Sequence, residues 1–136
     1  MMKKRQAHAD TCPCGSGSPY PGCCERWHHG PAALQAPDPG ALMRSRYSAF
    51  VLDLTDYLLA TWHPDTRPAG IEPNPPGTRW LGLEIRREAM QDPDHGTVEF
   101  VARRRLNGRA DRLHEVSRFV REDGRWYYLD GEFPKG

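Results

Sequence analysis

Apolar residues recur every three or four positions between residues 39 and 62, and this spacing predicts one long amphipathic helix. Asp38 is suited to cap the N-terminus of the helix, and Pro39 to occupy its first position, where a missing N–H does no harm. His63-Pro64 is expected to end it. The apolar stripe consists of Met43, Tyr47, Phe50, Val51, Leu54, Tyr57, Leu58 and Trp62.

From residue 78 onward the period changes to two, which predicts strands at 78–85, 97–106, 113–121 and 125–130. Asn107-Gly108 and Asp123-Gly124 are typical of tight reversals between antiparallel strands. A helix followed by such a meander indicates an α+β fold in which one sheet face packs on the helix. The segment 65–77, which holds four prolines, is expected to be an irregular lid or rim.

One strand carries charge where a dry core would not tolerate it. Glu115 shares a strand face with Ser117 and Phe119, so its carboxylate is expected to point inward. Unpaired buried charge is too costly to retain, and the sequence therefore favours a polar-lined cavity over a closed core.

The chain has 136 residues, a length that suits one ordinary domain and a small appendage. The net charge of +1 argues against nucleic-acid binding through phosphate contacts. Residues 1–10 are polar and are predicted to be disordered; they begin with basic residues, but no apolar stretch of a secretory signal follows. No later run is long enough for a membrane span, so a cytoplasmic location is expected, and a reducing compartment disfavours disulfides.

All four cysteines lie in one short segment, as Cys12, Cys14, Cys23 and Cys24. Zinc prefers four soft ligands in a tetrahedron, and the spacing predicts a zinc knuckle with one ion. His28 or His29 is close enough in sequence to replace Cys24 as the fourth ligand. Four protein ligands leave no open position, so the ion is expected to be structural. The predicted organisation is a disordered start and knuckle at 1–30, a connector at 31–38 and the globular domain at 39–136.

The cysteine segment resembles the SEC-C motif through its pattern Cys-Pro-Cys-Gly-Ser-Gly-x-x-Tyr-x-x-Cys-Cys. That zinc element is found at the end of the SecA translocation motor, where it contacts other proteins. The resemblance therefore implies an interaction surface on the knuckle.

The globular part is similar to the YchJ-like family of small bacterial proteins. The similarity rests on Arg44-Ser45-Arg46-Tyr47-Ser48-Ala49-Phe50, Thr61-Trp62-His63-Pro64, Trp80-Leu81-Gly82-Leu83, Phe100-Val101-Ala102-Arg103, Ser117-Arg118-Phe119 and 126–131. It implies a nuclear transport factor 2-like cone with a pocket between sheet and helix. Many members carry a second SEC-C motif after the domain, but no cysteine follows Cys24 here, so one zinc is expected.

The pocket of such a cone is expected to be formed by aromatic and charged residues of the helix and strands, with Glu115, His63 and Tyr47 as catalytic candidates beside Asp92 and Tyr128. A carboxylate in an apolar pocket can act as a base. Each of two candidates also has a structural alternative to catalysis. Glu115 could form an ion pair with Arg46, Arg103 or Arg118. His63 could make a hydrogen bond at the end of the helix. The predicted pocket residues are Arg46, Tyr47, Phe50, Trp62, Trp80, Arg103, Glu115, Arg118 and Tyr128.

The sequence favours a non-catalytic adaptor whose knuckle contacts a protein partner and whose cone supports it or holds a small ligand. The first alternative is a small-molecule enzyme that uses acid–base chemistry of the isomerase, dehydratase or hydrolase type in the cone. A lesser alternative is single-stranded nucleic-acid binding through Tyr20, Arg26 and Trp27 of the knuckle. No nucleotide-binding loop or nucleophile elbow is present, so no organic cofactor is expected.

Overall fold

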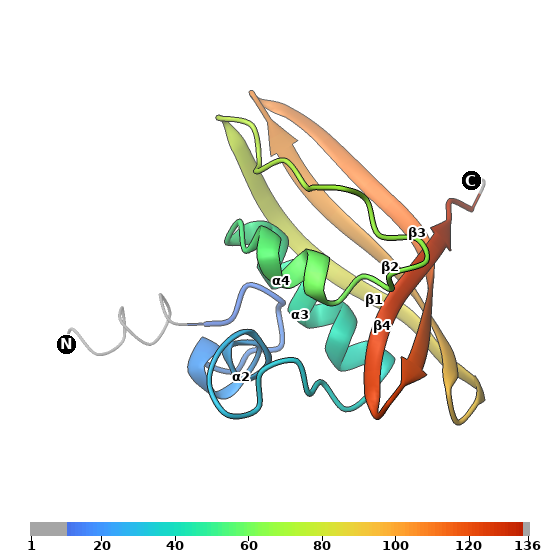
Figure 1. Ribbon diagram of the computed structural model, residues 1–136. Helices are drawn as coiled ribbons and strands as arrows, with labels where there is room; N and C mark the ends of the chain where they lie inside the picture. The colour runs from blue at the N-terminus through green and yellow to red at the C-terminus, as the bar shows by residue number, and fades with distance from the viewer. Residues whose placement is uncertain (1–10, 135–136) are drawn as a thin grey trace.

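The computed structural model describes residues 11–134, with a helical N-terminal part followed by a four-stranded sheet (Figure 1). The predicted disorder of residues 1–10 lies outside this range. The elements are η1 (Tyr20–Gly22), α2 (Glu25–His28), α3 (Pro39–Val51), α4 (Thr55–Ala60), β1 (Thr78–Asp92), β2 (His95–Leu106), β3 (Arg109–Glu122) and β4 (Arg125–Glu132).

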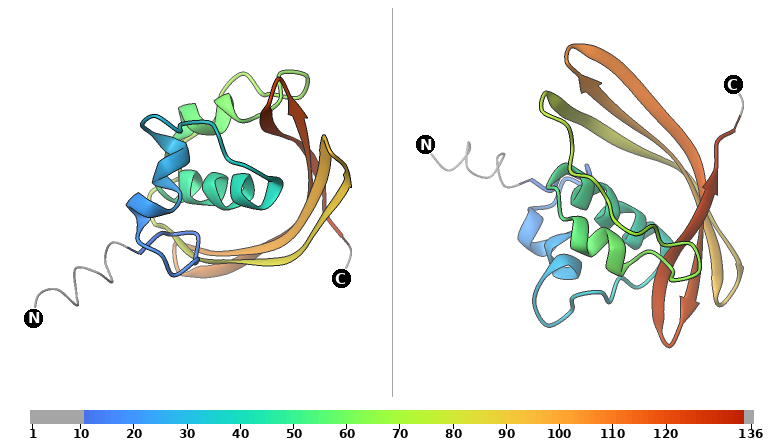
Figure 2. Two further views of the ribbon diagram at one scale, coloured as in Figure 1. Left: turned by 90° about the horizontal axis from the view of Figure 1, so that it is seen from below. Right: turned by 45° about the horizontal axis from the view of Figure 1, so that its top comes forward.

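The sheet is an antiparallel meander in the order β1-β2-β3-β4, which confirms the predicted α+β class and topology. Both predicted reversals are tight turns: φ is 51° and 83° at Asn107 and Gly108, and 53° and 79° at Asp123 and Gly124. Two successive left-handed residues suit a right-twisted hairpin. The strands are longer than the alternation predicts, since β1 continues to Asp92. The sheet curls around α3 and α4, leaving both helices on its concave side (Figure 2).

The prediction of one continuous helix is wrong. The chain leaves the helical path between α3 and α4, where Asp53 has a φ of 57°. Asn74 holds this corner, because its backbone N–H and side-chain amide both donate to the Asp53 carboxylate at 2.9 Å. Periodicity alone does not detect the break, because α4 also buries two apolar residues, Tyr57 and Leu58, which form a second cluster with Ala49 of α3. The predicted cap is confirmed by a 2.8 Å hydrogen bond from the backbone N–H of Ala41 to Asp38.

The core lies between the concave face of the sheet and α3. Phe119 and Val98 of the sheet are 1% and 0% exposed, and Leu42 of α3 is 1% exposed. The four cysteines belong to the same buried cluster, so the cysteine segment packs onto the core. None of the helices within residues 11–134 is long and apolar enough to cross a membrane.

Candidate functional site

The four cysteine sulfurs form a compact group, all within 4.8 Å of one another, and all four residues are buried. A tight turn presents the first pair, and Gly15 has a φ of 83° within it. The Sγ atoms of Cys14 and Cys23 are 3.7 Å apart. In a tetrahedron of Zn–S bonds of about 2.3 Å the sulfurs are separated by about 3.8 Å, so the group fits a metal ion of this size.

Hydroxyl groups surround the sulfurs. Ser16 Oγ lies 3.1 Å from Cys23 Sγ, and Ser48 Oγ lies 3.5 Å from Cys12 Sγ. Hydrogen bonds from the side chains of Cys14 and Cys24 hold the pKa of Cys12 well below its usual value. Outer hydrogen bonds of this kind orient thiolate ligands and spread their negative charge.

His28, the alternative fourth ligand, is engaged elsewhere. Its Nε2 donates to the carbonyl oxygen of Ser45 at 2.8 Å, and its Nδ1 accepts from the Tyr20 hydroxyl at 2.7 Å. His29 is not part of the group of possible metal ligands within residues 11–134. The four cysteines are therefore the ligand set that the structure brings together, and His28 instead fastens the cysteine segment to α3.

A cavity of about 660 Å³ opens between α3, the proline-rich segment and the concave face of the sheet. Seven of the nine predicted pocket residues line it: Arg46, Tyr47, Phe50, Trp62, Trp80, Glu115 and Tyr128. Glu72, Pro73, Asn74 and Pro75 of the proline-rich segment form part of its rim, as expected for that segment. The volume lies within the range of small-molecule sites, about 300–1,000 Å³.

Glu115 supplies a carboxylate to the cavity and is only 7% exposed. Its Oε2 accepts hydrogen bonds from Ser117 Oγ at 2.7 Å and Tyr128 Oη at 2.9 Å, whereas Oε1 has no partner within residues 11–134. Burial, followed by the negative charge of Glu115, raises the pKa of Tyr128, which keeps this hydroxyl protonated as a donor.

Arg46 places a cation in the same wall and is 3% exposed. Its guanidinium donates to the carbonyl of Leu58 at 2.8 Å and to Thr61 Oγ1 at 2.7 Å. It also lies over the rings of Tyr128 and Trp62, 4.6 and 5.2 Å from their centroids. Burial lowers the pKa of Arg46 to about 10, so the side chain remains charged at neutral pH.

The structure corrects the prediction for Arg103 and Arg118, which do not line the cavity. Alternation along β2 turns Arg103 away from the side of Ala102, and it lies 3.6 Å from Glu84. Arg118 forms a double hydrogen bond with Asp130 on the exposed side of β3 and β4. The alternative that Glu115 pairs with Arg103 or Arg118 is wrong, since these arginines contact Glu84 and Asp130 instead. Arg46 makes no direct ion pair with Glu115, but the two charges interact electrostatically within the cavity wall.

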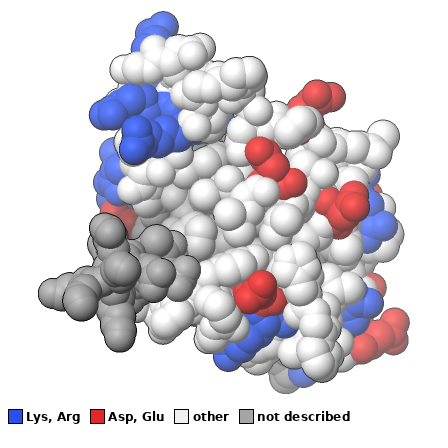
Figure 3. Space-filling model, turned by 90° about the vertical axis from the view of Figure 1, so that its left-hand side faces the viewer, with Lys and Arg blue, Asp and Glu red and all other residues white. Residues whose placement is uncertain are grey.

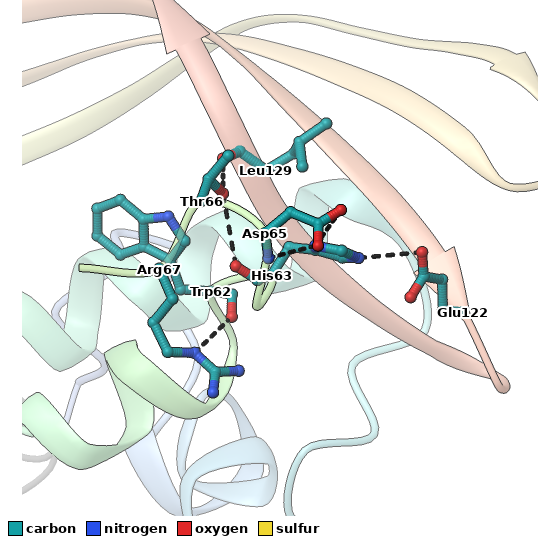
Figure 4. A network of polar contacts seen from close by, with 7 residues as sticks. All are labelled: Trp62, His63, Asp65, Thr66, Arg67, Glu122 and Leu129. Carbon is teal, nitrogen blue, oxygen red and sulfur yellow. Dashed lines mark hydrogen bonds and ion pairs between the residues drawn. The ribbon is translucent and has the colours of Figure 1, made fainter. Parts of the chain in front are cut away.

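His63, a catalytic candidate, also lies outside the cavity lining. Figure 4 shows it between the loop after α4 and the end of β3. Its Nδ1 accepts from the backbone N–H of Asp65 at 3.1 Å, and its Nε2 approaches the carboxylate of Glu122 to 3.0 Å without an aligned hydrogen bond. The ring therefore joins loop to sheet, which matches the structural alternative for this residue. Asp92 is likewise remote and contacts His95 at a hairpin.

Sequence reasoning missed several residues of the cavity wall. Asn74 is the most informative, because its side chain accepts from the Trp80 indole at 3.3 Å and donates to the carbonyl of Phe50 at 2.7 Å. No periodic pattern marks a loop residue of this kind. The other missed lining residues are Met43, Phe100, Ala102, Arg104, Asp111, Arg112, Leu113, Ser117 and Phe133.

Comparison with known proteins identifies relatives along nearly the whole chain. A family model described as the middle NTF2-like domain of YchJ matches residues 38–131. The UPF0225 protein of Bordetella bronchiseptica is 62% identical over 131 residues, which covers 96% of this chain and 98% of that protein. The UPF0225 protein of Chromobacterium violaceum is 54% identical over 135 residues, with coverage of 96% and 98%.

Two solved structures share the fold. A SEC-C motif containing protein from Rhodopseudomonas palustris is 34% identical, with a TM-score of 0.78 over 92% of this chain and 99% of that one. A SEC-C motif containing protein from Psychrobacter arcticus is 28% identical, with a TM-score of 0.75 over 96% of this chain and 86% of that one. The fold, the cysteine group and these relatives agree, and the chain belongs to the YchJ-like family of UPF0225 proteins.

Proposed function

We propose that this protein binds a small organic molecule in the cavity and that its four cysteines hold one structural zinc ion. The observation that carries the first part is the cavity of about 660 Å³ with a buried carboxylate whose Oε1 has no hydrogen-bond partner within residues 11–134. An unsatisfied buried polar atom is expensive, and a ligand that donates to it offsets that cost.

The wall of the cavity indicates the chemistry of the ligand. Seven of the lining residues are aromatic, as in sites for flat, largely apolar molecules: Tyr47, Phe50, Trp62, Trp80, Phe100, Tyr128 and Phe133. The free Oε1 of Glu115 can accept a hydrogen bond. The ligand is therefore expected to carry at least one donor on an apolar body.

The zinc assignment rests on four thiol groups within 4.8 Å of one another, of which those of Cys14 and Cys23 lie 3.7 Å apart, the separation expected in a tetrahedral site. Four cysteines complete the coordination of zinc, so a bound ion has no open position for substrate. When bound, the ion supplies a cross-link within the segment and cancels thiolate charge. We expect about one zinc per chain by metal analysis of the reduced protein, and its absence would contradict the assignment.

Ligand binding is testable with the fluorescent probe anilinonaphthalene sulfonate and two matched variants. Leu113 lines the cavity and is 40% exposed, whereas Leu81 is 46% exposed and lies outside the lining. We expect one saturable site in the native protein, at least about tenfold weaker binding in Leu113→Trp, and unchanged binding in Leu81→Trp. Equal binding by all three proteins would refute the proposal.

A second candidate, acid–base catalysis, is favoured by the free Oε1 of Glu115 beside the hydroxyl of Tyr128. A carboxylate held by donors in an apolar cavity can remove a proton from a bound molecule. Glu115→Gln preserves shape and would retain ligand binding while abolishing turnover of any compound that a metabolite screen identifies as a substrate. Equal turnover by Glu115→Gln would exclude this role.

The protein partner expected at the knuckle and the cytoplasmic location stay predictions. The segment exposes residues 15–19, a polar turn rather than an apolar surface. Co-purification that compares the native chain with Cys12→Ser/Cys14→Ser tests the partner prediction, and identical partners from both proteins would contradict it.

A further inference from the structure

The end of the sheet where β1 begins, β2 ends and β3 begins is strongly basic. Figure 3 shows Lys and Arg side chains gathered toward the top of the molecule, the end at which Figure 1 places the turn between β2 and β3. The strand segments 78–84, 102–106 and 109–113 contain Glu84 and Asp111 as their acids. They contain six arginines: Arg79, Arg103, Arg104, Arg105, Arg109 and Arg112.

The register places like charges directly opposite each other. Arg79 pairs with Arg105 across β1 and β2, and Arg103 pairs with Arg112 across β2 and β3. Such pairs destabilise a sheet, so their presence calls for a compensating anion. Within residues 11–134, Arg79, Arg105 and Arg112 form no ion pair, whereas Arg103 is 3.6 Å from Glu84.

A surface depression of about 490 Å³ lies at the first of these pairs and is lined by Gly77, Thr78, Arg79, Arg105 and Gly108. The two glycines have no side chains to block the approach of a ligand. Two guanidinium groups beside such an opening match the oxygens of a phosphate group, because the planar fork of arginine donates two parallel hydrogen bonds.

We propose that this arginine face, defined as Arg79, Arg103, Arg105 and Arg112, binds the phosphate backbone of nucleic acid, with one phosphate in the depression. Arginines two residues apart on a strand are separated by about 6.6–6.8 Å, and opposed residues by about 4.5–5.5 Å. The face therefore presents a row of cations that suits successive phosphates rather than a single small anion.

The surroundings of the face favour nucleic acid over an acidic protein. Among the described residues of segments 78–84, 102–106 and 109–113, Leu81 is the one large exposed apolar side chain that does not line the cavity. A protein interface requires a desolvated apolar centre, which one leucine does not supply. Contacts of this type position a backbone without specifying its sequence. The total charge of +1 does not indicate this local basic surface, because acids elsewhere in the chain balance these arginines.

The test measures binding of the full chain to a labelled DNA duplex and a labelled RNA duplex by fluorescence anisotropy as salt is raised. Four phosphate contacts predict a slope of log K against log salt of about −3.6 for DNA, which weakens binding about 100-fold between 50 and 200 mM salt. Arg79→Gln/Arg105→Gln is expected to reduce the magnitude of the slope by about 2 and to weaken binding more than tenfold at low salt. Its melting temperature should be unchanged or higher, since a repulsive pair is removed.

The control variant Arg121→Gln/Arg125→Gln removes the same charge from the hairpin between β3 and β4, outside the arginine face. It should bind both duplexes like the native chain. An equal loss in the control would overturn the proposal, because binding would then follow net charge. Stronger binding to polyglutamate than to either duplex would overturn it in favour of an acidic protein. Binding of inorganic phosphate without binding of either duplex would overturn it in favour of a small anion.

Discussion

Gly131→Ala is the most direct test of how the cavity carboxylate is held. Gly131 lies opposite Ser117 in the register of β3 and β4, and the side chain of Glu115 rests on it. A Cβ atom at this position would lie 2.8 Å from Glu115 Cγ and closer still to the carboxylate. The substitution must therefore displace Glu115 from its hydrogen bonds with Ser117 and Tyr128.

The expected cost follows from those two contacts, at 2.7 and 2.9 Å. Hydrogen bonds to a charged group contribute about 1.5–3 kcal/mol each, and water in the cavity recovers part of that when they break. Alanine is also favoured over glycine in a strand by about 0.5–1 kcal/mol. We expect Gly131→Ala to lower the free energy of unfolding by about 2 kcal/mol, and the melting temperature by about 7 °C for a chain of this length.

A double-mutant cycle separates this mechanism from a general defect of the strand. Urea unfolding followed by tryptophan fluorescence gives the free energy for the native chain, Gly131→Ala, Glu115→Ala and the double variant. With Glu115 shortened to alanine the clash disappears, so Gly131→Ala should then be neutral or slightly stabilising. An equal cost in both backgrounds, or no cost in the native background, would refute the account.

Three further outcomes follow from buried groups elsewhere. Cys14→Ser should abolish stoichiometric zinc and lower the melting temperature by more than about 10 °C by calorimetry, because the cysteine segment packs on the core; retained zinc would contradict this. Leu42→Ala should cost about 2–5 kcal/mol in urea unfolding, since Leu42 is 1% exposed, and a cost below about 1 kcal/mol would contradict its place in the core. Burial raises the pKa of Tyr47 and of Tyr57 to about 12. Because unfolded tyrosine loses its proton near pH 10, their contribution to stability is complete below pH 10 and is lost between about pH 10 and 12. Urea unfolding across this range should show a weaker decline in Tyr47→Phe/Tyr57→Phe, and an unchanged decline would contradict it.

The sheet and its turns were predictable because alternation and left-handed turn residues are local properties of the chain. The position of Glu115 followed in the same way, from the strand face that it shares with Ser117 and Phe119. The break at Asp53 was not predictable, since it depends on Asn74, which is distant in sequence and contributes no periodicity.

The predicted ligands of the metal group were easier to identify than the wall of the cavity. Four cysteines in one segment have few alternative uses, whereas an arginine can snorkel, pair or bind. The prediction that Arg103 and Arg118 line the pocket is wrong because alternation along β2 and β3 turns both away from the concave side of the sheet. The arginine face could not be predicted from the amino-acid composition, because it depends on the cross-strand register that places Arg79 opposite Arg105.

Helix α3 lies between the cysteine segment and the cavity and contributes side chains to both. Ser45 and Ser48 hold the cysteine segment on one side through His28 and Cys12, while Arg46, Tyr47 and Phe50 face the cavity on the other. Coupling between two binding sites is reciprocal. If removal of metal from the cysteine segment weakens binding in the cavity by some factor, a ligand in the cavity therefore strengthens metal binding by that same factor.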